Sequence, residues 1–307
     1  VRVHIHSDFP SEVFSQLQQF GDITYQKVDD MVMQNEIQFN RKSEIALVTD
    51  SACDLPKAVL DQYQIHVVPL SVHFGATYFL DRLTINPPQF YAMLEKSELP
   101  ASSAQPASKE FQNKFEYLAT HYKSIIGIHL SQGLSGTYSS SSKGSQDVIT
   151  RTGKKIDVVN SGSVTGGLGL IVLRAARALE EGASHEEVMS HMEEWKTKSM
   201  IRVSVTTLKY IIRSGRVSPF KSFVAKMFDL KPIIYVDHDG KASLFSKSFS
   251  EKSSMKKVMR NISRIVAGRK VWEYAITHAG NPSAVQWYAE EMEKLTGKKP
   301  LFVDHAS

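Results

Sequence analysis

The chain has 307 residues, of which 42% are hydrophobic and 22% charged, and its formal net charge is +5. This composition is that of a globular protein with a sizeable core, so disordered and collagen-like chains are excluded. The basic residues are scattered and do not alternate with stacking aromatics, so we expect no nucleic acid partner.

The chain contains one cysteine, Cys53. A single cysteine cannot form an intramolecular disulfide, which is typical of proteins in the reducing cytoplasm. Nothing near it in the sequence indicates a paired base, so we interpret Cys53 as a structural thiol. No stretch approaches about 18 consecutive apolar residues, so we expect no transmembrane helix and no stable membrane insertion.

Residues 1–40 look like a small unit, followed by a polar linker at Asn40–Ser43. Val1–His6 alternates with period two, which predicts a strand and not a signal peptide. Because the chain begins with valine inside this element, we expect it to be a fragment of a longer protein. The rest of the unit predicts a helix, a second strand and a third strand or connecting segment, at Pro10–Phe20, Ile23–Asp29 and Met31–Phe39.

From Glu44 onward, short apolar runs alternate with amphipathic segments. The runs predict strands, mostly buried on both faces, at Ile45–Thr49, Ile65–Phe74, Ser124–Leu130 and Ile156–Val159. The segments between them predict helices, at Pro56–Tyr63, Pro87–Lys96, Ser108–His121, Tyr138–Thr150, Leu170–Glu181 and Ser184–Lys196. This alternation predicts an α/β fold with a parallel sheet flanked by helices.

The pattern changes at about Ser199, and the remainder predicts a second, α+β lobe. Asp237–Gly240 is a tight turn, so Ile233–Ser246 is predicted to be a hairpin. The other predicted elements are strands at Arg202–Thr206, Lys231–Val236 and Val271–His278, and helices at Ser253–Val266 and Pro282–Leu295.

The strongest candidate site is the Gly/Ser-rich stretch Leu130–Tyr138, which follows a buried strand and begins a helix. Ligands of open parallel sheets bind at this edge, and a helix N-terminus favours an anion. Ser135 and Thr137 add hydroxyl donors. From these residues alone, a glycine turn with a serine N-cap explains the pattern equally well.

Two further stretches are candidates for the same site. Pro100–Pro106 is a polar loop framed by prolines, and Ser102 and Ser103 are hydroxyls on it. Arg216 follows Gly215 after a predicted helical turn, where its planar guanidinium could meet a carboxylate or phosphate. An ordinary loop and a surface arginine are the alternatives.

No nucleotide or hydrolase signature is present. The chain lacks G-x-x-x-x-G-K-[ST] and G-x-G-x-x-G, and the turn around Ser135 lacks the last glycine of G-x-S-x-G. His4 and His6 share a strand face, but no third residue lies at metal-ligand spacing. We therefore expect no catalytic residue, no metal and no cofactor.

Together these motifs resemble those of the DegV family of fatty-acid-binding proteins. The resemblance covers residues 45–307 and rests on stretches in the expected order: Val48–Ser51, Val68–Leu70, Pro100–Pro106, Leu130–Tyr138, Arg213–Val217 and Thr277–Asn281. Residues 1–40 resemble the end of a dihydroxyacetone-kinase-like fatty acid kinase subunit, through Val3–Ser7.

The resemblance implies a two-lobed protein with a long-chain fatty acid, such as palmitate, buried between the lobes. It implies that Ser103 and Ser135 bind the carboxylate and that Arg216 lies near it, although Ala104 replaces a serine of the family. Its domains would be 1–43, the kinase-like piece with its linker, then 44–198 and 199–307. The family's late His/Gly-rich strand would follow His305–Ser307 and so be missing.

The resemblance also implies a function. The protein would present the bound carboxylate to a fatty acid kinase, either a separate protein or a fused domain, and would not be an enzyme itself. Two alternatives stay open. Residues 1–40 favour part of a dihydroxyacetone-kinase-like phosphotransferase, and a bound lipid would also suit a lipid-sensing regulatory protein.

Overall fold

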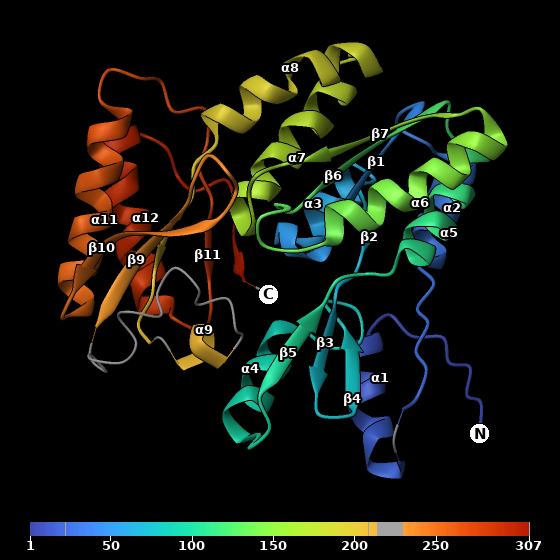
Figure 1. Ribbon diagram of the computed structural model, residues 1–307, viewed down its shortest axis with the longest axis horizontal. Helices are drawn as coiled ribbons and strands as arrows, with labels where there is room; N and C mark the ends of the chain where they lie inside the picture. Colours follow the sequence, from blue (N-terminus) through green and yellow to red (C-terminus); the bar gives the residue numbers. More distant parts are fainter. Residues whose placement is uncertain (22, 208, 214–229, 307) are drawn as a thin grey trace.

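The protein is described here by a computed structural model covering residues 1–21, 23–207, 209–213 and 230–306 (Figure 1). At its centre lies a four-stranded sheet in the order β2-β1-β6-β7. All three pairings are parallel, which confirms the predicted sheet. The strands are β1 (Ile45–Asp50), β2 (His66–Val68), β6 (Ser124–His129) and β7 (Lys155–Asn160).

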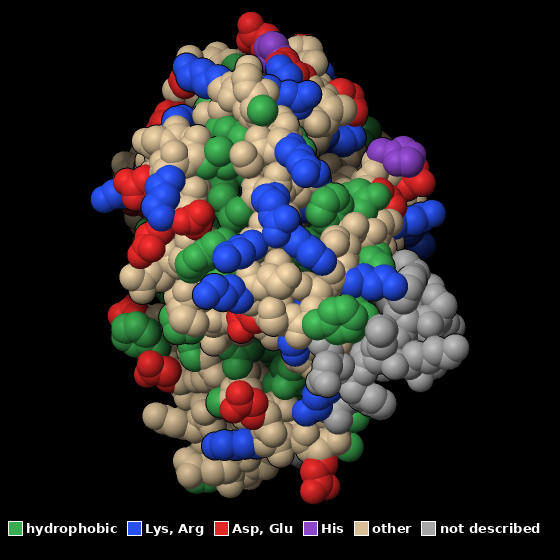
Figure 2. All heavy atoms as spheres, turned by 90° about the vertical axis from the view of Figure 1, so that its left-hand side faces the viewer, with side chains coloured by type: hydrophobic (Ala, Val, Ile, Leu, Met, Phe, Trp, Pro, Cys, Tyr) green, Lys and Arg blue, Asp and Glu red, His purple; other side chains and the backbone are tan. Residues whose placement is uncertain are grey.

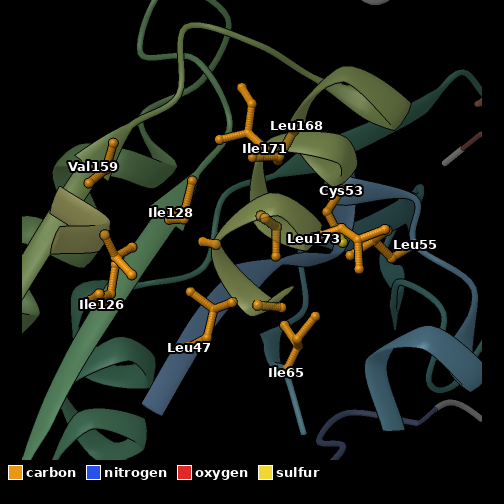
Figure 3. Close-up of a cluster of buried hydrophobic side chains, with 14 of the residues drawn as sticks. Leu47, Cys53, Leu55, Ile65, Ile126, Ile128, Val159, Leu168, Ile171 and Leu173 are labelled. Atoms are coloured by element: carbon orange, nitrogen blue, oxygen red, sulfur yellow. The ribbon is translucent and has the colours of Figure 1, made fainter. Parts of the chain in front are cut away.

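Helices cover both faces of this sheet because its strands are apolar on both sides. Ala46 and Ile125 pack under α5 and α6, whereas Leu47, Ile126 and Ile128 pack under α7 (Figure 3). Every residue of β6 is buried, which explains its continuous apolar run. The covering helices are α3 (Lys57–Gln62), α5 (Ser108–Ala119), α6 (Thr137–Thr152), α7 (Thr165–Glu180) and α8 (His185–Lys198).

Helices α5 and α6 approach closely at Gly144. A Cβ placed there would lie 2.6 Å from the carbonyl oxygen of Ser108 and 2.9 Å from the backbone nitrogen of Gln112. Backbone atoms cannot rotate away, so Gly144→Ala should overpack the contact by about 2–3 kcal/mol. The higher helix propensity of alanine offsets about 1 kcal/mol of this cost.

We therefore expect Gly144→Ala to lower the free energy of unfolding by about 1–2 kcal/mol, measured by urea denaturation. Gln146→Ala, at an exposed position of the same helix, is the control and should be nearly neutral. Equal stability of the two variants would show that the helices can separate without cost.

A small antiparallel sheet, β4-β3-β5, corrects two expectations. Ile65–Phe74 is two strands in different sheets, because Pro69 cannot donate to a ladder and lies between β2 and β3 (Ser71–Phe74). The predicted loop Pro100–Pro106 contains β5 (Ala101–Ala104), which pairs with β3. The hairpin partner β4 (Thr77–Leu80) was not predicted, and α4 (Pro87–Lys96) packs beneath the sheet.

The N-terminal unit also differs from its prediction. Val1–His6 and Ile23–Asp29 form no strand within the described residues, because alternation makes a strand only where a neighbour pairs with it. Met31–Phe39 is a helix, α2, and Asp30 caps it by accepting a hydrogen bond from the backbone N–H of Met33. The other helical segments are α1 (Pro10–Leu17) and the short 3-10 turn Gln18–Phe20.

Within its described residues, the unit forms no hydrophobic cluster of its own, and it docks on the rest of the chain. Ile37 is 1% exposed and packs into the cluster under α5. The backbone N–H of Gln26 donates to the hydroxyl of Tyr78, and its side-chain oxygen accepts from Thr84 at 2.6 Å. Residues 1–40 are therefore held through helix α2 and an extended segment.

We refer to the elements β1 to α8 as the first lobe and to the elements β8 to β12 as the second lobe. Strands β8 (Arg202–Ser204), β9 (Lys231–Val236) and β10 (Ala242–Ser248) make an antiparallel sheet, which confirms the predicted hairpin. A parallel pair, β11 (Ile276–His278) and β12 (Val303–His305), lies beside it. Thus only the end of the predicted strand Val271–His278 is β-structure. The described helices here are α9 (Lys209–Arg213), α11 (Glu251–Val266) and α12 (Pro282–Thr296).

Lysine and arginine side chains gather on the outer face of the second lobe (Figure 2). Lys252, Lys256, Arg260 and Arg264 recur every four residues on the exposed side of α11. Part of the chain's positive charge is therefore concentrated in one stripe. Among the helices of the described residues, none has the length and apolar character needed to cross a membrane.

Candidate functional site

The turn between β6 and α6 is held by Ser131, which is fully buried. Its backbone carbonyl accepts from the N–H groups of Leu134 and Ser135, and its own N–H donates to the carbonyl of Ser163 at 2.8 Å. These bonds fold the turn back on itself and tie it to the loop that follows β7. The turn therefore lies at the carboxyl edge of the sheet, where ligands of such sheets bind.

Ser135 is half-buried at the entrance to α6. Its Oγ accepts from the backbone N–H of Thr137 at 3.2 Å and lies 2.9 Å from the Thr137 hydroxyl, which is fully buried. The N-cap residue of α6 is Gly136, so the turn places the hydroxyls of Ser135 and Thr137 on either side of it, at the positive end of a 16-residue helix. Two hydroxyls and a helix terminus can hold an oxyanion such as a carboxylate.

The β9–β10 turn of the second lobe packs directly onto this turn. The Ser131 hydroxyl donates to the carbonyl of Gly240 at 2.7 Å. A Cβ on Gly133 would lie 2.7 Å from that carbonyl oxygen, and one on Gly240 would lie 2.0 Å from the Ser131 Oγ. Two glycines are therefore required where the lobes meet. Sequence reasoning missed this contact, since it treated Gly133 and Gly240 as separate turns.

The Pro100–Pro106 stretch reaches the same turn through Gln105. Its side-chain amide donates to Ser140 at 3.1 Å and occupies the space that a Cβ on Gly136 would need. Ser102 and Ser103 are exposed on β5, where they pair with His73 and Val72. Successive strand residues face opposite sides, so the two hydroxyls point in different directions. The structure thus brings this stretch beside the turn around Ser135.

Arg216 lies outside the described residues. Of the stretch around it, only α9 is described. The late Thr277–Asn281 stretch does meet the first lobe, because the hydroxyls of Thr277 and Thr165 lie 3.3 Å apart.

A buried polar network stands behind the turn. Asp50, at the end of β1, has Oδ2 3.1 Å from Nδ1 of His129, and the same oxygen accepts from the backbone N–H of Leu130 at 2.9 Å. The Nε2 of His129 lies 2.8 Å from the hydroxyl of Ser141 on α6. Asp50, His129 and Ser141 are all 0% exposed. The network fixes the first residue of the turn to the neighbouring strand and to the helix beyond.

Sequence reasoning did not single out this network. A signal was available, since Asp50 and His129 are polar residues at the ends of runs that are otherwise apolar. Buried polar groups are retained where they are paired, so two of them ending adjacent strands indicate a contact.

A second contact between the lobes centres on Arg82. Its guanidinium bonds Asp54 at 2.9 Å and Asp304 of β12 at 3.1 Å, and it also donates to the carbonyl of His305. Burial lowers the pKa of Arg82, but the adjacent aspartates outweigh this and the net shift is upward. Asp54, Arg82 and Thr165 have φ of +49°, +62° and +49°. A positive φ strains the backbone of a residue other than glycine, and such strained residues are found preferentially at functional sites.

Tyr91 and a histidine pair complete this contact. The Tyr91 hydroxyl lies 2.5 Å from the carbonyl oxygen of Ala306 and 3.2 Å from that of His278, and burial raises its pKa to about 12. The rings of His278 and His305 lie 4.5 Å apart. Burial and the neighbouring His305 lower the pKa of His278.

Within the described ranges, no group of three or more His, Cys, Asp and Glu side chains is arranged to hold a metal ion. His4 and His6 do lie together, with their Nε2 atoms 3.3 Å apart and exposed. Cys53 is buried, and desolvation raises the pKa of its thiol. A protonated, buried thiol suits the structural role expected from its sequence.

The family model of the DegV proteins, described as uncharacterised, matches residues 44–307. The chain belongs to the DegV family. This confirms the resemblance seen in the motifs. A second family model, the FakA-like middle domain of fatty acid kinase, matches residues 1–38. A DegV domain-containing protein of Caldanaerobacter subterraneus is 32% identical over 231 residues, covering 74% of this chain and 81% of the relative.

Solved structures of the family agree with the fold. A DegV family protein from Thermus thermophilus, described by its fatty acid binding, has a TM-score of 0.77 and 26% identity, covering 85% of this chain and 92% of its own. DegV from Bacillus subtilis, described as a fatty acid binding protein, has a TM-score of 0.76 and 26% identity, covering 86% and 93%. The two-lobed α/β architecture predicted from the sequence is therefore confirmed.

Proposed function

We propose that this DegV-family protein binds a long-chain fatty acid and holds its carboxylate at the turn around Ser135. The observation that carries the proposal is the site's construction: two hydroxyls at a helix N-terminus, with a glycine turn of the second lobe packed against them. Ser103, Ser102 and Thr137 are the further proposed ligand residues, with Arg216 near the head group. The fatty acid binding described for two structural relatives supports the ligand class.

The energetics of this ligand suit the fold. Burying a 16-carbon tail at ~0.8 kcal/mol per methylene contributes roughly 12 kcal/mol before association costs are subtracted. The carboxylate adds little net affinity because its desolvation offsets the hydrogen bonds. Its role is to fix the end of the chain, which makes one carboxylate oxygen available to a second protein.

The second protein in this proposal is a fatty acid kinase. Residues 1–38 match part of such a kinase, and in this structure they dock against the first lobe through Ile37 and Gln26. The DegV lobes would supply the positioned substrate, and the kinase would supply nucleotide and metal to form the acyl phosphate. The chain would then act in the cytoplasm as a binding unit without catalysis of its own, divided into domains 1–43, 44–198 and 199–307.

Two alternatives are tested by different results. Because the sequence contains no nucleotide-binding signature, we expect this chain alone to form no phosphorylated product from ATP, and such a product would favour the dihydroxyacetone-kinase-like enzyme. If the chain is a lipid sensor, fatty acid should change a partner's activity with no phosphorylation of the lipid.

The test is acyl loading followed by removal of one hydroxyl. Native mass spectrometry of the protein purified from cells, or after incubation with palmitate, should show one bound acyl chain. Ser135→Ala should raise the Kd for palmitate by about 10-fold or more, since hydrogen bonds to a charged group contribute about 1.5–3 kcal/mol. Ser139→Ala, an exposed serine on the same helix, is the matched control and should bind normally.

The two arms separate the parts of the proposal. A protein that never takes up an acyl chain would rule out the function. A Ser135→Ala variant that loads and binds as tightly as Ser139→Ala would leave the function intact and show that the carboxylate lies elsewhere.

A further inference from the structure

A groove on the outer side of α7 and α8 lies apart from the candidate site. The two helices follow each other in the chain and pack side by side (Figure 1). With Trp272, which precedes β11, they enclose a groove of about 630 Å³. This volume falls within the range of about 300–1,000 Å³ that is usual for ligand sites.

Cations and aromatic rings alternate along the groove. Arg174 on α7 stacks on Trp272, with its Cζ 4.3 Å from the ring centroid, and lies 5.9 Å from the Trp195 ring of α8. Arg177 lies over the same Trp272 at 5.4 Å, and His191 stacks on Trp195 at 5.8 Å. The indole rings contact the flat face of the Arg174 guanidinium. Its N–H donors lie in the guanidinium plane, so they remain available to a ligand.

Arg174 and Arg177 differ in what those donors meet. Arg177 donates from Nη1 to both carboxylate oxygens of Glu273, each at 2.9 Å, and from Nε to the hydroxyl of Tyr63 at 3.3 Å. In the part of the chain that the structure covers, the Arg174 guanidinium makes no hydrogen bond or ion pair. A half-buried guanidinium held between two indoles is therefore ready to receive a carboxylate.

The rim of the groove carries the opposite charge. Glu181, Glu187 and Glu194 line it and are exposed. Glu194 is paired with Lys198 at 2.5 Å, whereas Glu181 and Glu187 form no ion pair within the described residues. Glu181 and Glu187 therefore favour an occupant that carries positive charge in addition to the acidic group that reaches Arg174. Tryptophan and arginine are also the residues that most often dominate protein–protein contacts.

We propose that this groove binds a short peptide segment of a partner protein, with an acidic side chain on Arg174 and a lysine or arginine beside Glu181 and Glu187. The charge pattern of the groove selects this occupant: an acidic peptide meets the rim unfavourably, and a basic one leaves Arg174 without a partner. This site is independent of the proposed acyl site, because none of the residues that line the groove is one of the proposed ligand residues of that site.

The test is selection from a random decapeptide display library on the immobilised protein. The enriched peptides should combine an acidic residue with a lysine or arginine. Synthetic copies should perturb tryptophan fluorescence, since Trp195 and Trp272 are two of the chain's three tryptophans. Exchange of the acidic residue for its amide should weaken binding at least ~10-fold, as expected when a bidentate charged contact is lost.

Arg174→Met keeps the aliphatic stem between the indoles and removes the donors, so it should weaken the same peptides at least ~10-fold. Arg174→Lys should also weaken them, because an ammonium lacks the planar fork. Arg264→Met, which removes one exposed charge from α11, is the matched control and should bind normally. Melting curves of each variant verify folding.

Three results would overturn the proposal: no enrichment above an uncoated surface, enriched peptides without an acidic residue, or equal binding by Arg174→Met and Arg264→Met.

Discussion

Replacing Asp50 with alanine is expected to lower the free energy of unfolding by about 3–5 kcal/mol. The carboxylate is 0% exposed. One of its oxygens accepts from two buried donors, Leu130 and the ring of His129, and the other accepts from the backbone N–H of Ala52 at 3.2 Å. Without the carboxylate, both buried donors have no partner, and each unmade bond costs about 1–3 kcal/mol. Asp50→Asn keeps one acceptor and should lose about 1–2 kcal/mol.

Urea denaturation measures the free energy of unfolding of Asp50→Ala, with Asp61→Ala as the control. Asp61 forms an exposed pair with Lys57 at 2.8 Å, and such pairs contribute about 0–1 kcal/mol. A loss below about 1 kcal/mol for Asp50→Ala would mean that water replaces the carboxylate. Since Leu130 begins the turn that carries Ser135, we also expect Asp50→Ala to bind palmitate more weakly.

Replacing Arg82 with methionine is expected to cost about 3 kcal/mol and to loosen the second lobe from the first. Methionine keeps much of the volume of the arginine side chain, so the loss of stability comes mainly from removing the positive charge and the hydrogen-bond donors. Arg82 joins Asp54, which is 1% exposed, to Asp304 of β12. Burying Asp54 beside an apolar side chain leaves its charge less compensated than in the native protein.

Hydrogen exchange gives the local readout. The backbone N–H of Ala306 donates to the carbonyl of His278 at 2.9 Å beside this contact, and its protection should fall in Arg82→Met. Arg151→Met, which removes an exposed pair with Glu116, is the control and should leave it unchanged. Full protection at Ala306 in Arg82→Met would show that the β11–β12 pair is held by Tyr91 and the histidines instead.

The candidate site was only partly predictable from the sequence. The Ser135 turn was located because its signals are local: an apolar strand, a glycine pair and a helix start within the stretch Leu130–Tyr138. The contacts that hold it are not local. Asp50 meets His129 across 79 positions, Ser131 meets Gly240 across 109, and Arg82 meets Asp304 across 222.

The sequence by itself determined the parallel sheet, most of its helices and the β9–β10 hairpin. Each is encoded by periodicity, by turn residues or by apolar runs read over about ten positions. The same kind of reading failed at Val1–His6, Ile65–Phe74 and Met31–Phe39. Whether alternation becomes a strand depends on a neighbour, and only the tertiary structure provides or withholds that neighbour.

Only the tertiary structure decided how the lobes meet around the Ser135 turn. In the sequence, Gly133 and Gly240 are ordinary turn glycines. In the structure the two turns lie so close together that a Cβ on either residue would clash with the opposite turn, so both positions require glycine. Likewise, Arg174 is one of several helical arginines until two tryptophans from different elements enclose it. The physical reason is the same in both cases: steric fit and charge pairing depend on distances in space that no local pattern of residues records.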